Sequence, residues 1–500
     1  MNYPSRRPGR AVVQLPLTCS RCDNVFVLLF RAVVLEQSTS TNIRDTFSTS
    51  NSMTEPTTSQ ASLRVERAVC ARCGCMCDDI GLRYEQDRVL RIDRACELGR
   101  EWLQRTRSLV PKARLLGQPT TIANAIDRAA QLLAAANAPA MVGLRDLSVE
   151  ALRAAVDLAR SAKTTLTPLP SSTLVQERLG LDAPEFAASL GAVRATADLV
   201  VFWRADPVAT HPRHLERYSG EAELLSGGKR QVWLVDDAEN VPKNRTVEKS
   251  SQIISLPTAG KHTLVPHTDV EFILRTHELL TKRSLNDSVE NDPAAMLASA
   301  MLRAKHTHVF LGREAGDDLS LMSAWNFLAA KLRDRLHVTI SPLTTGGNER
   351  GVVETLTWLT GVPGPMAYDS SFTQLGETSG DWLPSVLTPE LLQQPNACDV
   401  LLVIGADALE RPASKLFASK LFASKIPRIV IASQPDLTAA VSIVLPLLDP
   451  RLNATIVRSD GIFLTLCGDG QQGVSDPAVE ILRAIGERVI QHERAAGGAK

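Results

Sequence analysis

Five cysteines lie close together in the 500-residue chain, which holds nine in all. Cys70, Cys73 and Cys77 follow the spacing C-x2-C-x3-C, and Cys96 comes later in the chain. This spacing is typical of a four-iron four-sulfur cluster, in which a tight loop offers three thiolates and a later segment returns with the fourth. We therefore predict an iron–sulfur site whose ligands are Cys70, Cys73, Cys77 and Cys96.

Two alternatives to this site stay open on the sequence. Zinc also binds four cysteines, but a zinc ribbon usually pairs one C-x2-C with a second, and Cys96 has no such mate. The cysteines could also bind no metal. We expect the fifth cysteine, Cys75, to pack as a small apolar residue, although it could exchange roles with Cys77. Clustered cysteines in a long chain favour metal binding in a reducing compartment over a disulfide framework.

Short segments of β pattern surround the cysteines, and a helical pattern follows at 97–107. From about residue 123 onward, helical patterns alternate with short apolar strands. We expect strands at 140–144, 199–203, 232–235, 253–256, 308–311, 338–340, 400–404, 428–432 and 443–445. We expect helices at 149–161, 270–282, 317–335 and 477–493. This alternation predicts an α/β protein with parallel, doubly wound sheets that carry helices on both faces.

Composition divides the chain into an N-terminal leader and several domains. Residues 1–62 include a stretch rich in Ser and Thr with little apolar content, so we predict a disordered leader and a true start at Met53. After it we expect a cysteine-rich iron–sulfur-type module at 63–118. A first α/β domain at 119–265, a second at 266–440 and a C-terminal segment at 441–500 complete this division.

The overall charge argues against nucleic-acid and membrane partners. The 55 Lys and Arg residues balance 55 Asp and Glu residues, so no net charge draws the chain to nucleic acid or to anionic lipid. The apolar stretch 25–35 is interrupted by Arg31 and is shorter than the roughly 18–20 residues of a membrane span. We expect a cytoplasmic protein that binds neither nucleic acid nor membrane.

Three stretches together resemble the B subunit of formylmethanofuran dehydrogenase, within the molybdopterin oxidoreductases. They are Cys73–Ile80 (CGCMCDDI), Asp198–Tyr218, which ends in HPRHLERY, and Gly346–Gly361, which begins GGNERG. The resemblance extends over most of the chain from Leu63 to about Ile481. It implies a multi-domain molybdopterin-oxidoreductase-like fold in which residues 441–500 are a remnant of the pterin domain.

In archaea, members of this family hold a tungsten or molybdenum pterin and reduce carbon dioxide to formate. A bacterial counterpart belongs to a formyltransferase/hydrolase complex, which carries one-carbon units on tetrahydromethanopterin and a methanofuran-like carrier. The resemblance therefore implies partner subunits of the amidohydrolase-like and formyltransferase types.

The chain departs from the family at three positions. Val149 stands where the family has the cysteine or selenocysteine that binds the metal, and an isopropyl group cannot bind it. Arg204 stands where a glycine lets the backbone approach a phosphate, and Ala454 replaces the glycine of a Gly-Thr pair. A shift in register could offer Ser148 as a ligand, and Arg204 could instead bind a phosphate.

These departures favour a subunit that keeps the fold, lacks catalytic and pterin-binding residues, and holds at most the iron–sulfur cluster. Two rival functions are an active redox subunit and an electron-transfer subunit without pterin. We expect His211 and His214 to have a structural role, and Asp78 and Asp79 to form an exposed turn.

Overall fold

The computed structural model describes residues 63–85, 87–105, 108–167, 188–220, 224, 228–237, 252–256, 267–282, 292–312, 319–344, 346–361, 363, 366–368, 381–382, 398–405, 426–468 and 473–497. All of these residues lie in one compact unit, Ser59–Lys500. The predicted leader and the proposed start at Met53 lie outside them. None of the helices in the described part of the chain has the length and apolar character needed to cross a bilayer.

The cysteines lie in a small antiparallel sheet with one short helix. Strands β1 (Leu63–Ala68), β2 (Ile80–Glu85) and β3 (Arg88–Asp93) pair in sequence order. Helix α1 (Glu97–Leu103) follows at once, as the sequence pattern predicts. The cysteine-rich loop connects β1 to β2, and Cys96 immediately precedes α1. The small sheet therefore carries both cysteine-bearing segments.

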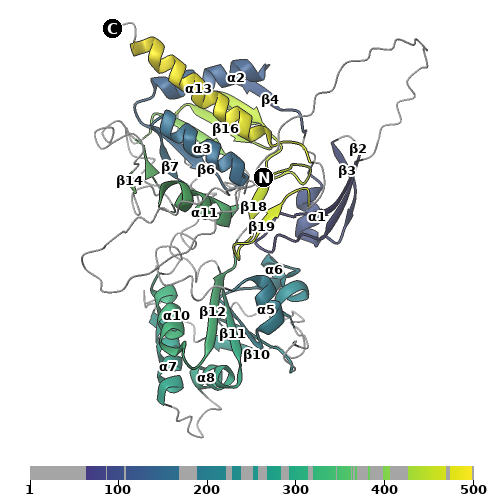
Figure 1. Ribbon diagram of the computed structural model, residues 1–500, viewed down its shortest axis with the longest axis vertical. Coiled ribbons are helices and arrows are strands. Elements are labelled where there is room, and N and C mark those ends of the chain that lie inside the picture. The colour runs from purple at the N-terminus through teal and green to yellow at the C-terminus, as the bar shows by residue number, and fades with distance from the viewer. Residues whose placement is uncertain are drawn as a thin grey trace, which may run out of the picture. The chain divides into compact units, whose positions relative to one another are not determined.

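A five-stranded sheet is entirely parallel, in the order β10-β9-β8-β11-β12 (Figure 1). Its strands are β8 (Leu199–Trp203), β9 (Gln231–Asp237), β10 (Gln252–Leu256), β11 (His306–Leu311) and β12 (His337–Pro342). Its accompanying helices are α5 (Leu190–Thr196), α6 (Pro207–Thr210), α7 (His267–Lys282), α8 (Pro293–Arg303) and α10 (Leu319–Leu332), with a π-helical turn at Leu215–Ser219. The core between the sheet and α7, α8 and α10 includes Trp203 and Trp325, which contact edge to face.

A nine-stranded sheet has the order β14-β13-β7-β6-β15-β16-β17-β4-β5, and its central strands, β7 to β17, are parallel. Those strands are β6 (Pro139–Gly143), β7 (Thr165–Thr167), β15 (Val400–Ile404), β16 (Arg428–Ala432) and β17 (Val441–Val444). The edges are antiparallel: β4 (Lys112–Leu115), β5 (Gln118–Thr120), β13 (Met366–Ala367) and β14 (Asp381–Trp382). The expectation of an α/β fold with parallel sheets is confirmed.

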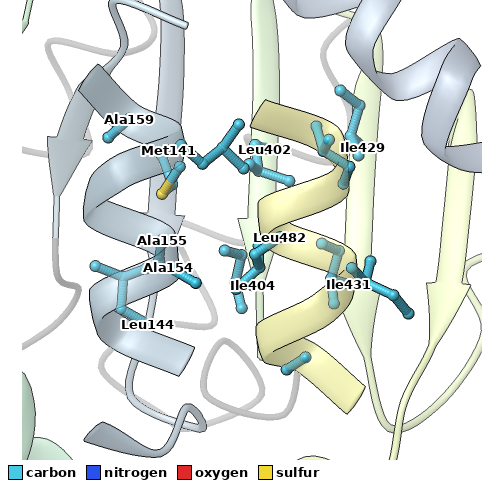
Figure 2. Close-up of a cluster of buried hydrophobic side chains, with 14 of the residues drawn as sticks. Met141, Leu144, Ala154, Ala155, Ala159, Leu402, Ile404, Ile429, Ile431 and Leu482 are labelled. Carbon is cyan, nitrogen blue, oxygen red and sulfur yellow. The ribbon is translucent and has the colours of Figure 1, made fainter. Parts of the chain in front are cut away.

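Three helices pack on one face of the nine-stranded sheet: α2 (Ile122–Ala135), α3 (Val149–Ser161) and α13 (Pro477–Gly497). Ala154, Ala155 and Ala159 of α3 and Leu482 of α13 belong to one buried cluster with sheet residues such as Leu402 and Ile404 (Figure 2). Gly486 of α13 lies against Leu158 of α3, since a Cβ on Gly486 would be 3.7 Å from the Leu158 Cα. Small residues thus allow the two helices to approach closely.

Strand pairing joins segments that are far apart in the sequence. β6 pairs with β15 from Pro139–Val400 to Gly143–Ile404. Packing also joins distant segments. Strands β18 (Thr455–Val457) and β19 (Phe463–Thr465) form a short hairpin, and β18 contacts both α3 and a further helix, α11 (Glu349–Thr360). The domain boundaries expected from the sequence stay a prediction.

Candidate functional site

The cysteine loop is closed by its own backbone. The Cys70 amide donates a hydrogen bond to the Cys77 carbonyl at 2.9 Å, and the Met76 amide donates to the Cys73 carbonyl at 3.1 Å. Met76 has a φ of 38°, a left-handed conformation that turns the chain sharply. Consequently the three cysteines that we predicted to come from one loop lie on one tight turn.

Cys96 reaches the same place from the start of α1. Its Sγ accepts a hydrogen bond from the Gly99 amide at 3.4 Å, so this thiol acts as the N-cap of the helix. A Cβ on Gly99 would lie 3.1 Å from the Cys70 Sγ and 3.5 Å from the Cys96 Sγ. Both sulfur atoms therefore face one glycine, although they come from different segments.

The thiols influence each other electrostatically. Burial raises the pKa of Cys70, and the neighbouring Cys73, Cys77 and Cys96 raise it further. Burial and Cys73 raise the pKa of Cys77 to about 12, against the opposing effect of Arg217 and Arg213. A metal would therefore have to displace the protons of the thiols when it binds.

Cys75 contacts the predicted ligands instead of packing only among apolar side chains. The pKa of the Cys75 thiol is raised, mostly by a hydrogen bond with Cys73 and to a smaller extent by burial. Its exchange with Cys77 as a ligand thus stays open. Within the described ranges, no group of three or more His, Cys, Asp or Glu side chains is arranged to hold a metal ion. The four-ligand assignment stays a prediction.

The donor set nevertheless fits an iron–sulfur cluster. The four predicted ligands are soft thiol donors, none of them fully exposed, and they come from the loop between β1 and β2 and from the start of α1. A cluster bound by four thiolates carries negative charge, and the guanidinium groups of Arg213 and Arg217 lie close enough to affect the Cys77 thiol.

Two arginines of the HPRHLERY stretch hold the cysteine loop through Asp78 and Asp79. Arg213 donates from Nη1 and Nη2 to the two Asp79 oxygens, both at 2.8 Å. Arg217 pairs with Asp78 at 2.5 Å and also with Asp79. The expectation of an exposed turn is wrong, because the side chains of Asp78 and Asp79 are only 34% and 29% exposed. We name these four residues the arginine clamp.

The arginine clamp affects the ionisation of Asp79. Burial alone would raise the pKa of this carboxyl, but the hydrogen bonds from Arg213 and the charge of Arg217 outweigh burial, so the pKa is lowered. Asp79 is therefore ionised throughout the neutral pH range, and the ion pairs stay intact there.

The two histidines of this stretch are buried and hydrogen bonded within the protein. His211 Nε2 lies 2.8 Å from the Thr344 carbonyl oxygen, which also accepts a hydrogen bond from the Gly74 amide at 3.2 Å. His214 Nδ1 lies 2.7 Å from Ser219 Oγ. His211 thereby connects the HPRHLERY stretch to the cysteine loop through one backbone carbonyl.

The exit of strand β8 is filled by an ion pair. Arg204 has a φ of 51° and donates to both oxygens of Asp269, from Nε at 2.9 Å and from Nη2 at 2.7 Å. Trp203 Nε1 also donates to Asp269 at 3.1 Å, and Asp236 lies 3.5 Å from Arg204 Nη1. The guanidinium is therefore held by carboxylates of the chain itself.

Sequence reasoning missed Asp236 and Asp269 as partners of Arg204. Asp236 lies at the end of β9, the parallel neighbour of β8, and Asp269 lies in the first turn of α7. Carboxyl ends of parallel strands meet at one edge of a sheet, so the position of Asp236 carried a usable signal. Asp269 carried none, because the packing of α7 alone brings it there.

The start of α3 provides no replacement for the missing metal ligand. Val149 is the first residue of the helix. Ser148 Oγ accepts from the Ala151 amide at 3.1 Å and donates to Asp476 at 2.6 Å, so its hydrogen bonds are already made. Burial raises the pKa of Asp476, an effect that the hydrogen bond from Ser148 opposes. The nearby Ala454 is buried.

These residues do not fit a tungsten or molybdenum pterin. The position of the expected metal ligand has an isopropyl side chain, and the neighbouring hydroxyl is engaged with Asp476. At the β8 exit, Arg204 binds Asp269 where the family resemblance implies a small glycine beside a phosphate. The departures at Val149 and Arg204 thus remain departures in the folded chain.

Comparison with known proteins confirms the resemblance to formylmethanofuran dehydrogenase. The chain is 23% identical over 467 residues to the B subunit of "Tungsten-containing formylmethanofuran dehydrogenase 2" from Methanocaldococcus jannaschii, covering 85% of this chain and 98% of the relative. It is 22% identical over 428 residues to the protein of the same name from Methanococcus maripaludis, covering 80% and 93%. No protein-family model matches the chain.

A solved structure has the same fold. It is a chain from the crystal structure of the formyltransferase/hydrolase complex of Methylorubrum extorquens with methylofuran. The TM-score is 0.59 at 17% identity, and the match covers 76% of this chain and 99% of that chain. The chain is thus similar in sequence to the B subunit of formylmethanofuran dehydrogenase and similar in fold to a chain of that complex.

Proposed function

We propose that this chain is the B subunit of a formylmethanofuran dehydrogenase-like formyltransferase/hydrolase complex in one-carbon metabolism that depends on methanofuran and tetrahydromethanopterin. The two archaeal relatives support the subunit assignment, since the match extends over nearly their whole length. The fold of the Methylorubrum chain supports the type of complex. Amidohydrolase-like and formyltransferase subunits would be its partners.

In this proposal the chain is structural and does not carry out the redox reaction. The observation that carries this is the pair of changes at Val149 and Arg204. The first removes the thiolate that would bind the metal, and the second fills the strand exit with the Arg204–Asp269 ion pair. Formyl transfer and formate release would then belong to the partner subunits.

Cys70, Cys73, Cys77 and Cys96 would hold a four-iron four-sulfur cluster. Such a cluster, when bound, stores and passes single electrons. The chain's own contribution would be to place four thiolates, to keep Gly99 small beside two of them, and to position Arg213 and Arg217 near their negative charge. An electron-transfer subunit without pterin is therefore the second candidate.

Metal analysis of the complex purified from its native host tests this proposal. We expect iron and no tungsten or molybdenum in the wild-type complex, and the same in Val149→Cys, because one thiolate does not reopen the strand exit at Arg204. Formate-forming hydrolase activity should be equal in both. Stoichiometric tungsten or molybdenum, with dye-linked oxidation of formylmethanofuran, would establish the redox subunit instead.

Iron distinguishes the remaining possibilities. In one outcome, reduction with dithionite produces an electron paramagnetic resonance signal from the iron, and a mild oxidant removes it again. Such a reversible signal would support the electron-transfer candidate. Iron that resists both treatments would support a purely structural cluster. Absence of iron and zinc in a fully active complex would contradict the cluster and leave the scaffold role in place.

Gly99→Ala should lower the iron content while the chain still folds. The new methyl group would lie 3.1 Å from the Cys70 Sγ and 3.5 Å from the Cys96 Sγ, which pushes the two sulfurs apart. Gly191→Ala is the matched control, since this glycine is also helical and a Cβ there meets nothing nearer than Ser189 Oγ at 3.8 Å. We expect the control to bind iron like the wild type. Equal iron in both variants would contradict the convergence of these cysteines on one cluster.

A further inference from the structure

A pocket of about 660 Å³ lies at one end of the nine-stranded sheet, and neither the cysteine site nor the Arg204 ion pair uses it. Its lining includes Lys112 and Arg114 of β4, Thr121 before α2, and Ser433 and Gln434 after β16. The pocket has the volume of a small-molecule site, for which about 300–1,000 Å³ is usual.

The pocket occupies the edge of the sheet where ligands of parallel α/β sheets bind. Ser433 and Gln434 directly follow the carboxyl end of β16, and Val444 ends the neighbouring parallel strand β17. Lys112 lies opposite Val444 in the antiparallel pairing of β17 with β4. The carboxyl ends of the strands are where the ligand-binding crevices of such sheets form.

Two cations give the pocket its charge. Lys112 and Arg114 are two residues apart on β4, so their side chains lie on the same face of the strand. Lys112 is exposed, and no hydrogen bond or ion pair to its ammonium group occurs among the described residues. Arg114 Nη1 donates to the Gly117 carbonyl at 2.7 Å, which fixes the guanidinium group.

The carboxylate of the lining, Asp87, has its charge compensated by other groups. It accepts from Arg451 Nη1 at 3.0 Å and from the Leu109 amide at 3.3 Å. The cations Lys112 and Arg114 therefore set the charge that a ligand meets. Helix α2 also begins at the pocket and has no acidic residue in its first turn, so its positive end adds to the same potential.

The remaining lining suits a ligand that is only partly charged. Hydroxyl groups of Thr120 and Ser433 and the amide of Gln434 can donate hydrogen bonds, and the prolines 111, 119 and 435 with Ile122 form apolar walls. Phosphate oxygens accept hydrogen bonds and ion pairs of this kind, while the apolar walls accommodate a carbon skeleton or a base.

We propose that this pocket binds a phosphate monoester of nucleoside monophosphate size, with Lys112 and Arg114 as the groups that recognise the phosphate. This site would be separate from the cysteine site and from any one-carbon carrier. It rests on the pocket and its cations, and not on the proposed function, so either can fail without the other.

Isothermal titration calorimetry of the full chain with AMP, adenosine and inorganic phosphate tests the proposal. We expect AMP to bind with a dissociation constant below about 1 mM, adenosine to bind at least about tenfold more weakly, and the affinity for AMP to fall as salt is added. If only inorganic phosphate binds, the ester part of the proposal is wrong. No binding of any probe up to about 10 mM would overturn it entirely.

Lys112→Gln should weaken AMP binding about tenfold, because one charge-assisted hydrogen bond is lost. Its side chain is exposed, so the variant should fold like the wild type. Arg128→Gln is the matched control, since it removes one positive charge from an exposed position of α2 outside the pocket lining. Equal loss of affinity in both variants would show a general charge effect and contradict the site.

Discussion

Asp269→Ala should destabilise the part of the chain that holds the five-stranded sheet by about 3–5 kcal/mol, the largest effect that we expect from a single substitution. The substitution leaves the guanidinium of Arg204 without its bidentate partner and the indole of Trp203 without its acceptor. Both groups are poorly exposed, so water cannot fully replace the carboxylate. Urea unfolding followed by tryptophan fluorescence would measure the loss.

A double variant distinguishes the loss of the Arg204–Asp269 ion pair from a general destabilisation of the first turn of α7. Arg204→Gly in the Asp269→Ala background removes the unpaired charge and places glycine at a φ of 51°, which glycine adopts without strain. We expect it to recover part of the lost stability. Arg275→Gln, at the exposed pair with Glu278, should leave the unfolding curve unchanged. If Asp269→Ala behaves like Arg275→Gln, the Arg204–Asp269 pair does not stabilise the fold.

Asp79→Asn should loosen the cysteine loop and reduce stability at neutral pH by about 1–2 kcal/mol. The carboxylate holds Arg213 through two hydrogen bonds and also pairs with Arg217, and the loop with Cys77 precedes it directly. The expected loss is smaller than for a fully buried pair because the Asp79 side chain is 29% exposed. Faster alkylation of the thiols by iodoacetamide in the metal-free chain would report the loosening.

The pH dependence of the free energy of unfolding tests independently whether the arginine clamp stabilises the fold. Because the folded-state pKa of Asp79 is lowered, its contribution is present above the unfolded pKa of about 3.9 and is lost as the pH falls through the lower folded value. The wild type should therefore lose more stability than Asp79→Asn between about pH 5 and pH 2. Asp93→Asn, at the exposed pair with Arg91, is the control and should follow the wild type. Parallel curves for wild type and Asp79→Asn would contradict the clamp.

Local features of this protein could be predicted from its sequence. The spacing of Cys70, Cys73 and Cys77 indicated one tight loop, and hydrogen bonds between neighbouring residues close it. The apolar runs indicated the parallel strands, because strands buried on both faces are apolar along their length. The changes at Val149 and Arg204 could be recognised only through the family resemblance, and the loss of the pterin that they imply stays a prediction.

The meeting of distant groups depends on tertiary packing. Gly99 faces the sulfurs of both Cys70 and Cys96, and Asp269 reaches Arg204 from a helix. The turn after the cysteines was expected to be exposed, but Arg213 and Arg217 from beyond β8 bind it. Local patterns reflect propensities and hydrogen bonds between near neighbours, whereas these contacts depend on how sheets and helices pack. A sequence pattern fixes periodicity and turn positions, but packing alone fixes which side chain of one element faces which side chain of another.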